Sequence, residues 1–233
     1  LASHHKQLTT DDHPILGNQM NALMEKEHAA YPLYLVAATE ELRCFGIWEK
    51  LSPFLKETLP GTIPQLFEHL LARLERDHGK ELVAATMSII ACSRSGMTEV
   101  EMIEMVSSGS DYVVFNEPQI SNFTRLYFGL SVFISCGGSG LLQLFHSQLL
   151  AIVRKRYLLS PQEAASIDHE RLLDPDFSSS KTTFFHLLLA KFFYNKATKR
   201  DTFQSGSEEQ CEPTPGQSTS LEIDEALVWT GDY

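Results

Sequence analysis

The feature that most constrains the fold of this chain is a single β-hairpin pattern that lies among helical segments. Two apolar runs, 132–135 and 141–145, flank the glycine-rich stretch 136–140. Apolar strands around a glycine-rich turn are typical of an antiparallel hairpin, because glycine adopts the positive φ angles that tight turns require. The sequence therefore predicts a mainly α chain that contains one β-hairpin.

Helical patterns stand on both sides of the hairpin. The segment 63–78 has apolar side chains at helical spacing: Ile63, Leu66, Phe67, Leu70, Leu71 and Leu74. The nearly apolar segment 82–92 is expected to form a central core helix, and Thr98 and Glu101 have the spacing of a capping box for the next helix. Two further helical patterns flank the hairpin, 122–130 and 146–157. Three helices, a hairpin and a closing helix predict a winged-helix domain.

The N-terminal part is predicted to be a small helical domain. A short helix is expected at 17–30, and Pro32 fits the first turn of a second helix over 33–45, where its missing N–H is not needed. Gly46 fits the left-handed position after that helix. The segment 46–64 contains three prolines and is predicted to be a loop or linker with a short helical turn.

These patterns divide the chain into four predicted parts. A helical domain with its linker takes 1–62, the winged-helix domain 63–160, a helical extension 161–200 and a disordered acidic tail 201–233. The tail is rich in Ser, Glu, Gln, Thr, Pro and Gly, so it has too little apolar surface to form a core. The chain starts without Met, which is expected of a fragment.

The charge distribution bears on possible partners. The net charge is −11, and after Arg200 there are eight acidic residues with no Lys or Arg, so residues 1–200 carry −11 + 8 = −3. Neither part supplies the positive field that nucleic-acid binding normally needs. There is no apolar run of about 18 residues, so no membrane partner is expected.

Cysteine usage indicates a reducing compartment. The four cysteines are scattered without a C-x-x-C pair, and Cys44 and Cys92 stand in apolar helical patterns that predict buried thiols. We therefore expect a cytoplasmic protein. The His4–His5 pair has no partner cluster at metal-ligand spacing, so no metal site is predicted.

A set of short motifs carries a resemblance to a known family. The motifs lie, in order, at 32–35, 40–46, 71–75, 90–99, 144–146 and 156–158. Together they resemble NACHT-type members of the STAND class of ATPases, the large animal proteins that carry tetratricopeptide or WD repeats downstream. The resemblance covers about residues 1–197, and the tetratricopeptide branch with its nephrocystin-like relatives matches best.

The resemblance implies a place in a nucleotide switch. In that family a P-loop ATPase core is followed by a small helical domain and a winged helix, which fold over bound ADP. Two residues would contact the nucleotide in the parent protein: Pro32, near the adenine, and His146, which would reach the β-phosphate. A histidine can bond a phosphate oxygen, and protonation strengthens that bond. ATP or ADP would be the cofactor of the parent, and none is expected for this fragment.

The chain also departs from the family pattern. There is no G-x-x-x-x-G-K-[ST] loop, because Gly79 and Lys80 are followed by Glu81. The acidic strand that would hold the metal is absent, so no catalytic residues are predicted. Tyr31 stands where a small polar residue is expected before the proline, and the expected repeats do not follow residue 200.

Simpler readings of the same residues stay open. Pro32 can be an ordinary helix-start proline, and His146 a residue at a strand–helix joint that bonds a backbone carbonyl. His186 lies in an apolar helix and is expected to be a core or interface histidine. That helix carries too many aromatic residues for one buried face, which predicts packing against another helix or a missing domain.

The prediction is a non-catalytic regulatory and protein-interaction fragment of a NACHT-type switch. Its partners would be the P-loop ATPase core and the repeat domains of the parent, and the missing core is expected to leave apolar surface on the first helices. The alternative is a winged-helix nucleic-acid-binding module. The candidate recognition helix, 119–130, argues against that alternative, because it offers only Arg125 as a cation and looks buried.

Overall fold

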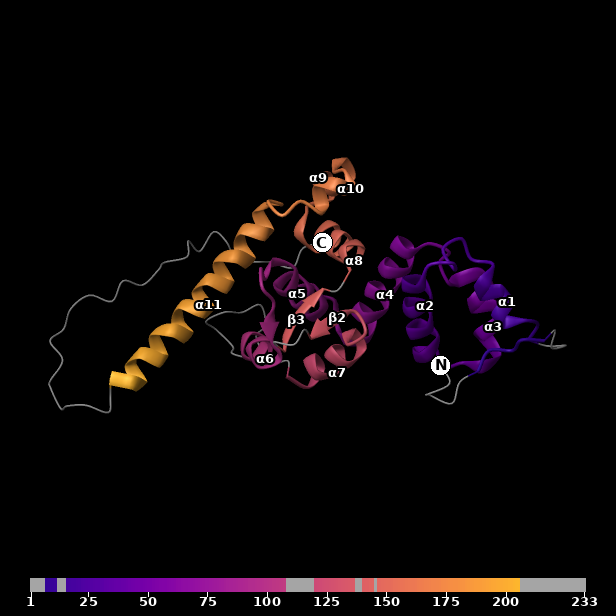
Figure 1. The fold of residues 1–233 in the computed structure, drawn as a ribbon, viewed down its shortest axis with the longest axis horizontal. Helices are drawn as coiled ribbons and strands as arrows, with labels where there is room; N and C mark the ends of the chain where they lie inside the picture. The colour runs from indigo at the N-terminus through magenta and orange to yellow at the C-terminus, as the bar shows by residue number, and fades with distance from the viewer. Residues whose placement is uncertain (1–6, 12–15, 108–119, 137–139, 145, 206–233) are drawn as a thin grey trace. The chain divides into compact units, whose positions relative to one another are not determined.

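The structure is a computed structural model that describes residues 7–11, 16–107, 120–136, 140–144 and 146–205 (Figure 1). Its contacts divide the chain into two compact units, Leu1–Asp77 and His78–Tyr233. The described part is mainly α, with one small antiparallel sheet in the second unit. The prediction of a mainly α chain is therefore confirmed.

In the described residues of the first unit, all the regular elements are helices. In chain order they are α1 (Gln19–Met24), α2 (Pro32–Cys44), η2 (Trp48–Lys50), α3 (Leu51–Pro53), η3 (Phe54–Thr58) and α4 (Ile63–His78), whose last residue already belongs to the second unit. All six apolar positions predicted for α4 are buried. The Gln19 side-chain amide donates to Ser52 Oγ at 3.0 Å, and this buried hydrogen bond joins α1 to α3. The helix at 63–78 is confirmed with the bounds that its period predicted.

The segment before α4 differs from its prediction. Residues 48–58 form consecutive helical turns rather than a loop, and Leu55 is fully buried among them. The prolines do not prevent this, because Pro53 stands in the first turn of α3 and Pro64 in the first turn of α4, where no N–H bond is lost. The proline count at 46–64 was therefore a misleading signal.

Three further expectations in the first unit are wrong. The first helix is shorter than 17–30, since α1 covers only Gln19–Met24. Gly46 is not left-handed, because α2 ends through the extended backbone of Phe45 at φ −71° and ψ 116°. Cys44 is exposed, because the last turn of α2 directs it away from the core, whereas Cys92 is buried as predicted.

The second unit contains the sheet and the remaining helices. Its elements are α5 (Lys80–Cys92), β1 (Met97–Thr98), α6 (Glu99–Ser107), α7 (Ile120–Leu130), β2 (Ile134–Cys136), β3 (Leu141–Leu144), α8 (Ser147–Val153), η4 (Arg154–Leu158), α9 (Pro161–Ser166), α10 (His169–Leu172) and α11 (Ser180–Ser205). Gly79, at φ +92°, separates α4 from α5. Helix α5 is buried along almost its whole length, so the predicted central helix is confirmed.

The sheet has the strand order β1-β3-β2. Strands β2 and β3 form the predicted hairpin, with Ile134 opposite Leu144 and Cys136 opposite Leu142. Its turn residues 137–139 lie outside the described residues. Strand β1 was not predicted, and it pairs with the other edge of β3 through Met97 and Leu142.

The start of α6 confirms the predicted capping box, and the end of α11 lies beyond its predicted position. The Thr98 N–H donates to a Glu101 carboxylate oxygen at 3.0 Å, and the Glu101 N–H donates to Thr98 Oγ1 at 3.2 Å, which is the predicted capping box of α6. Helix α11 continues to Ser205. The prediction of disorder over 201–233 is therefore wrong for residues 201–205, and the rest of the predicted tail, 206–233, lies outside the described residues.

Candidate functional site

Pro32 stands where the sequence placed it, at the first position of α2. It is exposed, and the Tyr31 side chain before it is 56% exposed. Tyr34 anchors the start of the helix in the core, because it is fully buried and its hydroxyl donates to the Pro60 carbonyl at 2.6 Å. The ring of Pro32 is therefore presented on a rigid helix start and faces solvent.

His146 lies at the joint between β3 and α8, where it is the N-cap residue of α8. Its backbone carbonyl accepts the Leu150 N–H at 3.1 Å, but its side chain makes no cap hydrogen bond. The side chain is half-buried, and burial lowers the pKa of the imidazole. The neutral imidazole is therefore the dominant form at neutral pH, with one N–H donor and one acceptor nitrogen.

The two predicted contact residues belong to different units. Pro32 is in the first unit and His146 in the second, so each is described within its own unit. Their roles toward a nucleotide stay predictions. The described residues contain no group of His, Cys, Asp and Glu side chains arranged to hold a metal ion.

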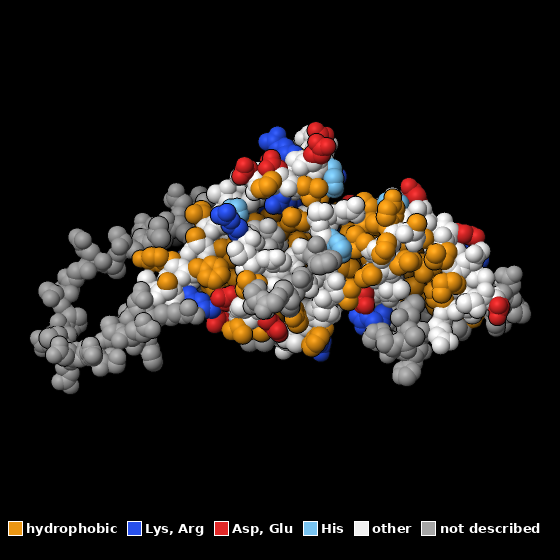
Figure 2. Space-filling view, viewed as in Figure 1, with side chains coloured by type: hydrophobic (Ala, Val, Ile, Leu, Met, Phe, Trp, Pro, Cys, Tyr) orange, Lys and Arg blue, Asp and Glu red, His pale blue; other side chains and the backbone are white. Residues whose placement is uncertain are grey.

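The first unit exposes several large apolar side chains. They lie on α1, at the start and in the middle of α2, and just after it: Met20, Met24, Tyr31, Val36 and Ile47, each 40% or more exposed. Figure 2 shows hydrophobic side chains gathered on the face of this unit around α2. We call these five side chains the "α1–α2 apolar surface". Exposed apolar surface on the first helices was expected from the sequence.

A buried ion pair holds α2 in place, and sequence reasoning missed it. The Glu41 carboxylate is almost fully buried, and Arg73 Nε of α4 donates to its two oxygens at 2.9 and 3.2 Å. His69 Nε2 lies 3.6 Å from the same carboxylate. Burial opposes the charge of Arg73, but the Glu41 carboxylate outweighs it and raises the pKa of the guanidinium. Both partners lie in motifs that carry the family resemblance, although no local spacing relates them.

The structure exposes His186, for which a core or interface position was expected, and one side of α7, which was expected to be buried. His186 is exposed on α11, because the buried face of that helix is made by neighbours such as Phe185 and Leu189. Helix α7 buries one face only, with Phe123, Leu126 and Leu130 inside. Arg125 is exposed and Phe128 is 67% exposed, so the candidate recognition helix has a free face with a single cation.

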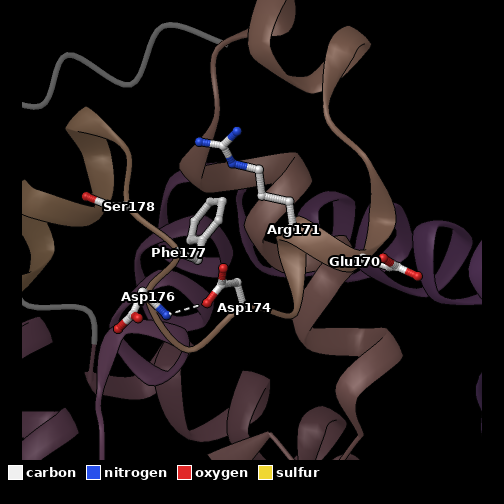
Figure 3. Close-up of a pocket in the computed structure, with 6 residues that line it drawn as sticks. All are labelled: Glu170, Arg171, Asp174, Asp176, Phe177 and Ser178. Atoms are coloured by element: carbon white, nitrogen blue, oxygen red, sulfur yellow. Dashed lines mark hydrogen bonds between the residues drawn. The ribbon is translucent and has the colours of Figure 1, made fainter.

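A polar pocket of about 480 Å³ lies beside α10 (Figure 3). The Asp176 N–H donates to an Asp174 carboxylate oxygen at 2.9 Å, while Glu170 and Arg171 point away from that pair. Arg154 stabilises the loop, since it donates to the carbonyls of Leu172 and Asp174 at 2.6 and 2.9 Å. The carboxylates do not converge on one point, so the pocket has no catalytic or metal-binding arrangement.

Comparison with known proteins supports the winged-helix assignment. Residues 51–165 match the family model described as NWD1-like, winged helix-turn-helix domain. The predicted winged-helix domain is therefore confirmed, in a NACHT-type context. The assignment to the tetratricopeptide branch is not tested by this match and stays a prediction.

Two curated relatives share part of the chain. Telomerase protein component 1 of Mus musculus is 36% identical over 91 residues, which are 39% of this chain and 3% of that protein. The Rattus norvegicus protein of the same name is 35% identical over 91 residues, with the same coverage. The chain thus spans only a small part of the length of these relatives. No solved structure matches it significantly.

None of the described helices combines the length and the apolar composition that crossing a bilayer requires. The cytoplasmic location stays a prediction.

Proposed function

We propose that this chain is a regulatory and protein-interaction part of a NACHT-type nucleotide switch. It packs on a P-loop ATPase core and passes the nucleotide state of that core to downstream repeats. The match of residues 51–165 to an NWD1-like winged helix supports the class of protein. The observation that carries the role is the α1–α2 apolar surface, because two of its members, Tyr31 and Val36, stand within four residues of the exposed Pro32.

The α1–α2 apolar surface fits a protein partner better than solvent. Large apolar side chains scattered singly on a surface need no explanation, but a gathered set marks an interaction site. Here Tyr31 and Val36 stand on either side of Pro32 along the chain, and Glu41 with Arg73 holds the helix that presents them. A rigid, apolar helix start is suited to cover a bound base or the core around it.

His146 would act in the closed, ADP-bound state. Its burial keeps the imidazole neutral, so that binding of a phosphate would raise its pKa and favour protonation. The resulting charge-assisted hydrogen bond would stabilise the closed state.

The experiment uses the longer natural protein that includes the coding region upstream of Leu1. We expect it to bind ADP, and we expect His146→Ala to weaken ADP binding by about 10- to 150-fold, since a hydrogen bond to a charged group contributes roughly 1.5–3 kcal/mol. Ser147→Ala, next to it and exposed, is the matched control and should leave the affinity unchanged. Equal ADP affinity in the wild-type protein and the His146 variant would contradict the assigned role.

The nucleic-acid alternative receives less support. The exposed face of α7 has Arg125 as its cation and the large apolar Phe128 beside it, whereas a groove-reading helix needs several donors to bases and phosphates. The net charge of −11 is also unfavourable for binding a polyanion.

A further inference from the structure

Helix α11 has two apolar faces, and only one of them is buried in the second unit. The buried face packs against α5 and η4 through Phe185, Leu188, Leu189 and Phe192. The opposite face is exposed and is also apolar, with Leu187, Ala190, Phe193, Tyr194 and Ala197. At 3.6 residues per turn these five residues fall on one arc of the helix. We call this arc the outer face of α11.

The outer face continues into a pocket of about 440 Å³. The turn after α5 forms one wall and α11 forms the other, and the lining residues are Cys92, Ser93, Arg94, Ser95, Gly96, His186, Leu189, Ala190 and Phe193. Hydrophobic side chains are visible along α11 in Figure 2. The result is a groove with an apolar floor, and the exposed Arg94 and His186 stand at its rim.

One cation stands at the rim of this groove. Arg94 is exposed there, whereas Lys196 of α11 is paired with Glu101 and Glu104 of α6, with Nζ–Oε distances of 3.2 and 3.3 Å. An occupant should therefore be mainly apolar, with an acidic group that can pair with Arg94.

One segment of this chain has that chemistry. Residues 221–229 read Leu-Glu-Ile-Asp-Glu-Ala-Leu-Val-Trp, so three acidic residues stand among six apolar ones. The other residues of 206–233 are mostly polar residues, Pro and Gly. We propose that residues 221–229 bind the outer face of α11 and the adjoining pocket within the same molecule.

The chain is long enough for this contact. Phe193 lies twelve residues before the end of α11 at Ser205, which is about 18 Å along a helix. The fifteen residues 206–220 can span at most about 50 Å. A linker of this length keeps the segment at an effective concentration on the order of millimolar near the groove.

The test uses the tryptophan inside the segment. The chain has two tryptophans, so Trp48→Phe leaves Trp229 as the only one in the full-length protein. We expect blue-shifted Trp229 emission and weak quenching by acrylamide, a neutral quencher. Adding Phe193→Asp to the outer face should shift the emission to the red and increase quenching. Raising the salt concentration should act in the same direction, because it screens the charge attraction.

Two further variants separate docking from damage to the fold. Ile223→Asp changes the segment and leaves α11 intact, and it should release Trp229 as Phe193→Asp does. Val100→Asp replaces a side chain that is 62% exposed on α6 and should leave Trp229 shielded. Circular dichroism and light scattering accompany each measurement. A Trp229 that is solvent-exposed in every variant overturns the proposal, and so does shielding that appears only together with a dimer. Neither result bears on the proposed switch function.

Discussion

The Glu41 carboxylate of α2 accepts hydrogen bonds from Arg73 Nε of α4 at 2.9 and 3.2 Å, and only 1% of the Glu41 side chain is exposed. This pair holds α2, the helix that begins at Pro32, against α4. A buried pair is costly to break, because Arg73 would keep only the exposed Asp77, 3.3 Å away, as an ionic partner. It thus determines how rigidly the α1–α2 apolar surface is presented.

Glu41→Ala should destabilise the first unit by about 1–3 kcal/mol, because it removes the buried carboxylate from the Arg73 guanidinium and leaves only the exposed Asp77, at 3.3 Å, as its ionic partner. The measurement is urea unfolding followed by circular dichroism. Glu40→Ala is the matched control on the same helix, since it removes the Arg43 pair at 2.7 Å, whose arginine is 31% exposed. That change should cost at most about 1 kcal/mol. Equal losses for the two variants would contradict the role given to Glu41.

Gly96→Ala should destabilise the second unit more than Gly140→Ala. Both glycines have positive φ angles, +83° and +70°. A Cβ at residue 96 would also lie 2.7 Å from the Leu142 carbonyl oxygen and from Gln143 Cγ, whereas nothing lies within 4 Å of a Cβ at residue 140. We expect about 1–2 kcal/mol from the backbone strain in each variant and an additional loss at residue 96. Thermal unfolding of both variants measures the difference, and an equal loss would show that β1 does not approach β3 as described.

The capping box of α6 should make stability depend on acid pH. Burial pushes the pKa of Glu101 upward, but hydrogen bonds from Thr98 and Lys196 outweigh it and hold the pKa below the ordinary value of 4.5. A lowered carboxyl pKa gives stability that is present above the unfolded pKa and is lost as the pH falls through the folded pKa. Glu101→Gln should therefore lower stability at pH 7 and flatten its fall below about pH 4.5. Urea midpoints measured from pH 7 to pH 3 provide the check, and identical profiles would exclude this contribution.

Cys44 and Cys92 should differ in reactivity. Burial raises the pKa of the Cys92 thiol to about 12, whereas Cys44 is exposed on the last turn of α2. Iodoacetamide at pH 8 should label Cys44 within the folded protein and reach Cys92 only after unfolding by urea. Peptide mass spectrometry distinguishes the two sites. Fast labelling of Cys92 in the native protein would mean that α5 is not the buried core helix.

The sequence was informative where a local rule decides the structure. The period at 63–78 predicts α4 with its correct bounds, and the spacing of Thr98 and Glu101 predicts a capping box whose two bonds are present. The hairpin followed from its glycine-rich turn in the same way. Each of these features is determined by residues close together in the chain.

The features that sequence reasoning missed depend on contacts between distant residues. Strand β1 has only two residues, which is too short for an alternating pattern, and it exists because Gly96 allows the chain to approach β3. Glu41 and Arg73 are 32 positions apart, so no local spacing indicates their pairing. Of the candidate site, the start of α2 at Pro32 and the strand–helix joint at His146 were predictable, but the gathering of exposed apolar residues required the fold.

Binding of an ATPase core by this chain is the most direct test of the proposed role. The proposed partner, a P-loop ATPase core of the NACHT type, is produced separately, loaded with ADP and titrated with this chain by calorimetry. We expect specific binding that Val36→Asp abolishes and that Val100→Asp, on the second unit, leaves unchanged. Absence of binding by the wild-type chain, or equal binding by both variants, would contradict the assignment of the α1–α2 apolar surface to that core.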